Sequence, residues 1–157
     1  MERQELLSQL NDLLETYGNH KAYADKAREQ ATSFSSSVIE KVIADHQIKA
    51  SLVADDITPL LPQLSAEIAR IEESKASAEN SKGDLGARIE ELELRKLIGE
   101  ISDEEFESLS SEGRGTVDAA NEALESLDAE LAELQAAMDK WVEISGGSVE
   151  IEAPVAD

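Results

Sequence analysis

Two histidines and many carboxylates are the side chains of this sequence that offer chemistry. The 157 residues include 35 Asp and Glu, two His and no Cys, which excludes disulfides and thiolate metal sites. His20 and His46 are 26 positions apart, and the chain lacks the Glu-x-x-His pair that holds di-iron centres in helical bundles. Its glycine-rich stretches lack the Lys-Ser/Thr of a phosphate-binding loop. The sequence therefore predicts no enzyme activity, no cofactor and no metal ligand.

Long helices are the elements that would position these side chains. Apolar residues recur at alternating spacings of three and four over residues 6–38, 61–96 and 117–141, the pattern of a coiled-coil seam. Two Phe, two Tyr and one Trp are too few to fill the wide core of a typical globular enzyme. His20 falls on the first seam, where we interpret it as a polar residue that fixes the register.

We call these three apolar repeats ladders. They predict an all-α fold, an elongated antiparallel coiled-coil hairpin closed by a third helix into a three-helix bundle. We expect one domain over residues 1–144 and a flexible acidic tail at 145–157. The first corner is expected near residue 57, because Thr58 precedes Pro59, which disfavours helix at Thr58 and suits the first turn of a new helix. The expected helices span residues 2–55, 59–98 and 103–143.

The second corner carries a complete set of signals for ending one helix and starting the next. Gly99 follows the second ladder, and Ser102 with Glu105 matches the Ser-x-x-Glu capping box. Ile101 and Phe106 occupy the two positions of a hydrophobic staple. We predict that this segment is a structural turn.

The sequence LRKLIGEISDEEFESL, residues 94–109, resembles the short SHOCT-type module found at the ends of many bacterial proteins. The shared features are leucines, a Gly, a turn and a Glu-Glu before an aromatic residue. The chain departs from that family because the segment lies internally and lacks the basic residues that usually follow the aromatic. The resemblance implies a small helical element that contacts another protein and performs no chemistry.

Negative charge is concentrated in the last third of the chain, where residues 100–157 carry 17 acidic and 2 basic side chains of a net charge of −21. This distribution disfavours nucleic acid and anionic membranes as partners. With a charged N-terminus and no apolar run of about 20 residues, we expect a cytoplasmic protein that does not enter the membrane. The acidic face of the third helix is interpreted as a solvated surface, or as a docking face for a basic protein: Glu122, Glu125, Asp128, Glu133 and Asp139.

The first helix offers more apolar surface than one seam requires, because Leu7, Leu14 and Tyr23 flank the ladder and widen its stripe. Its first turns are expected to overhang the second corner, where either Phe106 or a second chain covers them. The predicted protein-interaction residues are Leu6, Leu7, Leu10, Leu14, Tyr23 and Phe106.

These observations favour a non-catalytic coiled-coil scaffold, adaptor or assembly subunit that pairs with a helical partner or forms a homodimer. Two alternatives remain open. One is a metal- or ligand-binding helical bundle, and the other is an acidic mimic that occupies a basic or nucleic-acid-binding protein.

Overall fold

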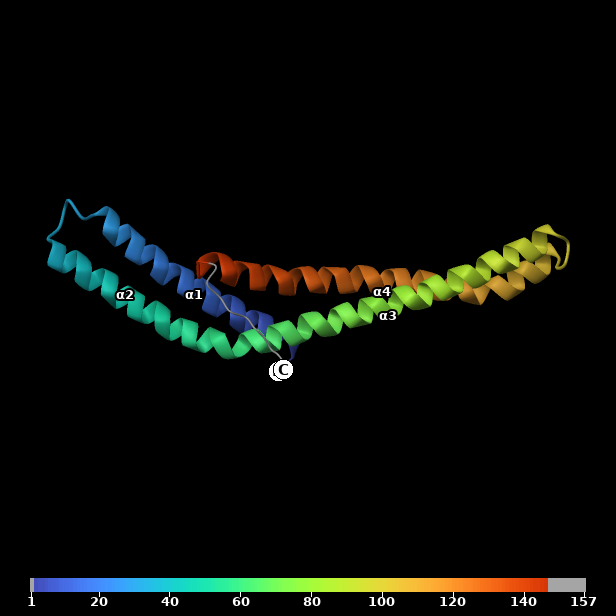
Figure 1. Ribbon diagram of the computed structural model, residues 1–157, viewed down its shortest axis with the longest axis horizontal. Coiled ribbons are helices and arrows are strands. Elements are labelled where there is room, and N and C mark those ends of the chain that lie inside the picture. The colour runs from blue at the N-terminus through green and yellow to red at the C-terminus, as the bar shows by residue number, and fades with distance from the viewer. Residues whose placement is uncertain (1, 147–157) are drawn as a thin grey trace. The chain divides into compact units, whose positions relative to one another are not determined.

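The computed structural model describes residues 2–146, and every regular element among them is helical. The order is α1 (Arg3–Glu29), α2 (Ser36–Ile57), the 3-10 helix η1 (Thr58–Leu60), α3 (Leu61–Leu97) and α4 (Asp103–Ile144) (Figure 1). The predicted all-α class is confirmed. No described helix combines the length and apolar character that crossing a membrane requires. Most of the predicted tail at 145–157 lies outside the described residues.

The helices are grouped into two compact units, which are described separately. Unit 1 comprises Met1–Ile68 and Glu133–Asp157, and unit 2 comprises Ala69–Ala132. Unit 1 therefore contains α1, α2, η1, the start of α3 and the end of α4. Because both units share α3 and α4, the expectation of one domain over residues 1–144 stays a prediction.

The predicted continuous helix over residues 2–55 is wrong, because the chain leaves the helix at 30–35. α1 ends with Gln30 as its C-cap, and α2 starts after Ser35. The intervening Thr and Ser residues hydrogen-bond readily to nearby backbone and so compete with helix formation. The break allows α1 and α2 to pack against each other as an antiparallel pair (Figure 1).

The predicted corner near residue 57 is also wrong, since the chain stays helical there. Thr58 has φ −50° and ψ −47° and forms the first residue of η1, after which α3 begins at Leu61. The Thr58 hydroxyl donates to the Ala54 carbonyl at 2.9 Å. Pro59 is tolerated because a proline in the first turn of a helix removes a donor that has no partner within the helix. The antiparallel hairpin thus lies between α1 and α2, with its corner 25 residues earlier than expected, near residue 32.

The core of unit 1 forms where the first half of α1 meets the η1 region and the end of α4. Tyr17 packs edge-on against Trp141, with ring centroids 5.0 Å apart. Arg3 pairs with Glu67 at 3.7 Å. Full burial of each large apolar side chain contributes about 1.5–3 kcal/mol. Other buried members are Leu6, Leu10, Leu14, Ile57, Leu60, Leu61, Leu64, Leu134 and Ala137.

Unit 2 is an antiparallel pair formed by α3 and α4 through the predicted seams. Ladder positions of α3 within residues 71–96 and of α4 within 106–131 are all buried or half-buried. Lys75 lies on the α3 seam with its Nζ 2.6 Å from Asp128 of α4. α4 contains Gly113 and Gly115 and is nevertheless a continuous helix through residues 113–115.

The corner between α3 and α4 has the predicted capping geometry. Gly99 has φ +86°, and the Gly99 and Glu100 amides donate to the carbonyls of Lys96 and Arg95 at 3.0 and 2.9 Å, which is a Schellman motif. The Glu105 amide donates to Ser102 Oγ at 3.1 Å, and the Ser102 amide donates to Glu105 Oε1 at 2.9 Å. The capping box is therefore complete on both sides.

Candidate functional site

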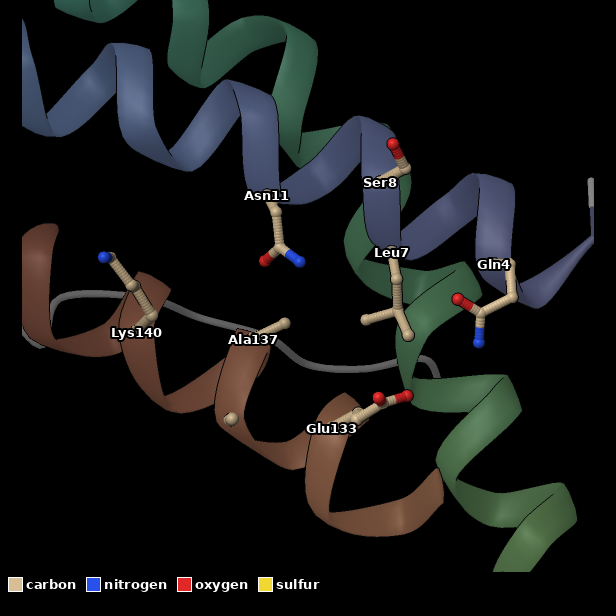
Figure 2. Close-up of a pocket in the computed structure, with 8 residues that line it drawn as sticks. Gln4, Leu7, Ser8, Asn11, Glu133, Ala137 and Lys140 are labelled. Carbon is tan, nitrogen blue, oxygen red and sulfur yellow. The ribbon is translucent and has the colours of Figure 1, made fainter. Parts of the chain in front are cut away.

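A groove of about 400 Å³ runs between α1 and α4 in unit 1. In Figure 2, Leu7 points from α1 towards Ala137 of α4, with polar side chains along the rim. The lining offers one carboxylate, one ammonium group, two amides and one hydroxyl, all of which suit hydrogen bonding. The lining residues are Gln4, Leu7, Ser8, Asn11, Glu133, Ala136, Ala137 and Lys140.

The predicted interaction leucines lie in the core of unit 1. Leu6, Leu7, Leu10 and Leu14 are between 0 and 6% exposed. The expected overhang does not exist, because the break at 30–35 places α2 and the start of α3 beside α1. These four side chains are therefore buried within their own chain, and their role as protein-interaction residues stays a prediction.

Phe106 and Tyr23, the two predicted aromatic interaction residues, have opposite environments. Phe106 is 5% exposed and lies under two cations, with Lys96 Nζ 4.4 Å and the Arg114 guanidinium carbon 5.6 Å from its ring centroid. These contacts assign it to the α3–α4 corner. Tyr23 is 48% exposed, so its ring remains accessible to a partner.

His20 of α1 and His46 of α2 face each other across the hairpin of unit 1. Their Nδ1 atoms are 3.0 Å apart, and their ring centroids are 5.2 Å apart with an interplanar angle of 32°. One Nδ1 must donate and the other accept when both rings are neutral. Tyr23 packs beside the pair, with its ring centroid 5.1 Å from that of His46 and 6.2 Å from that of His20.

Sequence reasoning missed this pair because it placed the two histidines on one helix. With the corner at 30–35, the heptad spacing of the two helices brings His46 opposite His20. The same register places Ala50, which is buried, opposite Tyr17. The serine-rich stretch at 33–37 was the available signal for the corner.

The outward-facing side of α2 carries a row of exposed apolar side chains. At 3.6 residues per turn, these positions lie within about 120° of the helix circumference, beside the seam that holds Ile39 and Ala50. Asp45 and Lys49 lie in the middle of the row and pair with each other at 3.1 Å. We call this row the outer stripe of α2: Val38, Val42, Ile48 and Leu52, which are 51, 40, 62 and 59% exposed.

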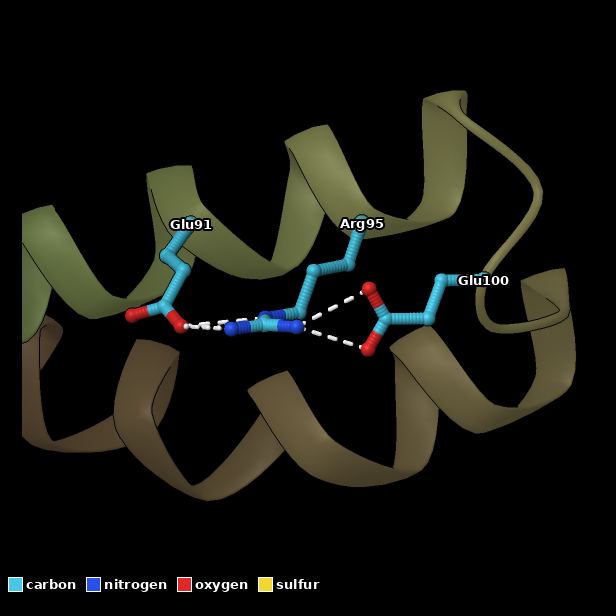
Figure 3. A network of polar contacts seen from close by, with 3 residues as sticks. All are labelled: Glu91, Arg95 and Glu100. Atoms are coloured by element: carbon cyan, nitrogen blue, oxygen red, sulfur yellow. Dashed lines mark hydrogen bonds and ion pairs between the residues drawn. The ribbon is translucent and has the colours of Figure 1, made fainter.

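Two basic side chains of unit 2, Lys75 and Arg95, have a raised pKa. Figure 3 shows Arg95 held between Glu91 and Glu100, with nitrogen–oxygen distances of 2.6–3.0 Å. Hydrogen bonds to Glu91 and then to Glu100 raise the pKa of Arg95 above its ordinary value. The hydrogen bond to Asp128 likewise raises the pKa of Lys75 above 10.5. Both groups therefore keep their charge at neutral pH.

No protein-family model, no curated protein and no solved structure matches this chain. The resemblance of residues 94–109 to the SHOCT-type module therefore stays a prediction.

Proposed function

We propose that this protein is a non-catalytic helical scaffold or adaptor that acts through protein–protein contacts, with the outer stripe of α2 as its contact surface. Four large apolar side chains on one side of a single helix, each at least 40% exposed, are the observation that carries the proposal. A row of this kind suits the apolar face of another amphipathic helix, which would remove both surfaces from water.

The partner that fits this surface is a helix from a second copy of the chain or from another protein. Tyr23 of α1 packs against His46 of α2 and is 48% exposed, so it adds accessible apolar surface to the hairpin. A net charge of −21 makes two copies repel, so self-association would strengthen with salt, whereas binding of a basic partner would weaken. This difference separates the two kinds of partner. The cytoplasm is the compartment that we propose for both.

The test for self-association is analytical ultracentrifugation of the intact chain at low and high salt. The stripe variant carries Val42→Glu and Leu52→Glu. A matched control carries Phe34→Glu and Val142→Glu, at side chains that are 58 and 37% exposed, so both variants gain two negative charges at exposed positions. We expect the wild type and the control to associate and the stripe variant to remain monomeric.

A wild type that stays monomeric at high micromolar concentration under both conditions would reject self-association. The same three chains then serve as baits in quantitative affinity purification from the source cells. The proposal expects a protein that is enriched on the wild type and the control and is lost from the stripe variant. Identical enrichment on all three baits would contradict a role for the stripe.

The acidic face of α4 favours binding of a second kind of partner, a basic protein. Glu122 and Glu125 are exposed in unit 2 and Glu133 and Asp139 in unit 1, whereas Asp128 is engaged by Lys75. We propose that this face attracts a basic protein by long-range electrostatics, which accelerates encounter and weakens as salt increases. Replacing Glu122 and Glu125 with Gln should slow the association rate and reduce its salt dependence, as measured by stopped-flow mixing with a basic partner.

A further inference from the structure

We propose that His20 and His46 form a binding site for a divalent transition metal, with Cu²⁺, Ni²⁺ and Zn²⁺ as the ligand class. The metal would be coordinated by the Nδ1 atom of each ring. These are the two histidines of the chain, so the site would take up its whole imidazole content.

The separation of the two nitrogens suits a shared metal ion. Metal–imidazole bonds of about 2.0–2.1 Å, meeting at 90–110°, place the two nitrogens about 2.8–3.4 Å apart. The observed Nδ1–Nδ1 distance is 3.0 Å. In the neutral pair a single proton lies between these two nitrogens. When the ion binds, that proton moves to Nε2 of the donating ring, so that both Nδ1 atoms present a lone pair. With the nitrogens 3.0 Å apart, the ion would lie about 1.4 Å to one side of the line joining them, and each ring would turn to aim its lone pair at the ion.

The hairpin holds both rings in place before any metal arrives. His20 and His46 lie on the facing seams of α1 and α2, and both are half-buried. The Tyr23 ring packs against both imidazoles and limits how far they can turn. Since the ligands need little ordering on binding, most of the coordination energy is retained as affinity.

Coordination would also reinforce the hairpin where its packing is thinnest. Of residues 21–45, only Ala24 and Ile39 are buried, so the seam near the corner is held by small or half-exposed side chains. A metal bound to one residue of each helix would link them across this region. Because the ion binds the folded hairpin, it raises the melting temperature by mass action.

The chemistry of the donors sets the choice of metal. Imidazole nitrogens suit Cu, Ni and Zn, whereas Mg²⁺ and Ca²⁺ prefer oxygen ligands, and affinity rises towards Cu²⁺. Among residues 2–146 there is no group of three or more His, Cys, Asp or Glu side chains that could hold a metal ion. The remaining coordination positions would therefore be filled by water, which leaves an exchangeable site open to an external ligand.

The experiment is isothermal titration of the chain, prepared without a polyhistidine tag, with Cu²⁺, Ni²⁺, Zn²⁺ and Mg²⁺ at neutral pH. We expect one transition-metal ion per chain, with Cu²⁺ bound most tightly. Either His20→Gln or His46→Gln should weaken binding by more than about tenfold, because losing even an outer-shell partner of a metal site typically costs that much. Long-range ¹H–¹⁵N spectra should show Zn²⁺ shifting the Nδ1 resonance of both rings.

The matched control is the double variant His20→Gln, His46→Gln, which keeps every carboxylate and so reports any cation binding to the acidic surface. Its helix content, measured by circular dichroism, must equal that of the wild type. Tyr23→Phe keeps the packed ring and should retain the affinity, whereas Tyr23→Ala should weaken it. Equal Zn²⁺ affinity in the wild type and the double variant, or Zn²⁺ shifts confined to Nε2, would overturn the proposal.

Discussion

The two corners of this protein, at residues 30–35 and 98–102, reverse the chain by different means. At 98–102, a glycine at positive φ, a Schellman motif and a reciprocal capping box satisfy the ends of both helices. At 30–35, the N-cap residue of α2, Ser35, makes no side-chain cap hydrogen bond, and residues 30–38 are exposed. One corner is specified by its own residues. The other exists because α1 and α2 gain more by packing together than by continuing as one helix.

The largest expected difference between the corners is in their aromatic residues. Phe106→Ala should lower the free energy of unfolding by about 3–5 kcal/mol, the usual loss for a buried Phe. Phe34, which is 58% exposed, should change it by less than about 0.5 kcal/mol when replaced by Ala, as surface substitutions do. Urea denaturation followed by circular dichroism measures both. Similar losses of unfolding free energy for the two variants would contradict the expected difference between the corners.

The next effect concerns backbone conformation at Gly99. Gly99→Ala forces an L residue into the left-handed region and should cost about 1–2 kcal/mol. Gly86 lies inside α3, where an added Cβ meets nothing within 4 Å, so Gly86→Ala should stabilise by about 1 kcal/mol through its better helix propensity. In thermal denaturation, the melting temperature should fall for Gly99→Ala and rise for Gly86→Ala. Stabilisation by both would mean that the Schellman turn does not persist in solution.

A smaller difference in stability is expected between substitutions of the two N-cap serines, Ser102 and Ser35. Ser102→Ala removes the hydrogen bond from the Glu105 amide and should destabilise by about 1 kcal/mol. Ser35→Ala removes no side-chain cap bond and should have a clearly smaller effect. Hydrogen exchange of the first-turn amides reports the change locally, and faster exchange is expected in α4 of the first variant. Equal acceleration in α2 of the second variant would show that Ser35 caps its helix in solution.

The smallest effect expected is from the exposed ion network at the second corner. Arg95→Gln should destabilise less than Ser102→Ala, and the difference should shrink as salt rises, because exposed pairs are screened. Since the pKa of Arg95 is raised, its contribution is present at neutral pH and is lost only as the pH rises through that raised value. Unfolding measured at two salt concentrations tests this. A salt-independent loss would assign Arg95 a packing role instead.

Some parts of the fold could be predicted from the sequence because their signals are local. The capping box at Ser102 and Glu105 and the glycine at 99 lie within seven residues of one another, and their hydrogen bonds satisfy backbone groups at the two helix ends. The seams of α3 and α4 were equally readable, because a three-four spacing of apolar residues fixes the buried face of any helix that forms.

The position where the first ladder folds back could not be predicted from local signals. The first seam runs across residues 30–35 without a glycine or proline to interrupt it, and the Thr-Pro at 58–59 indicated a corner that does not form. The choice rests on competition between distant surfaces, namely the packing of α1 on α2 against one long helix, and local propensity does not contain that term. From this choice follow the burial of Leu6, Leu7, Leu10 and Leu14, the exposure of the outer stripe of α2, and the meeting of His20 with His46.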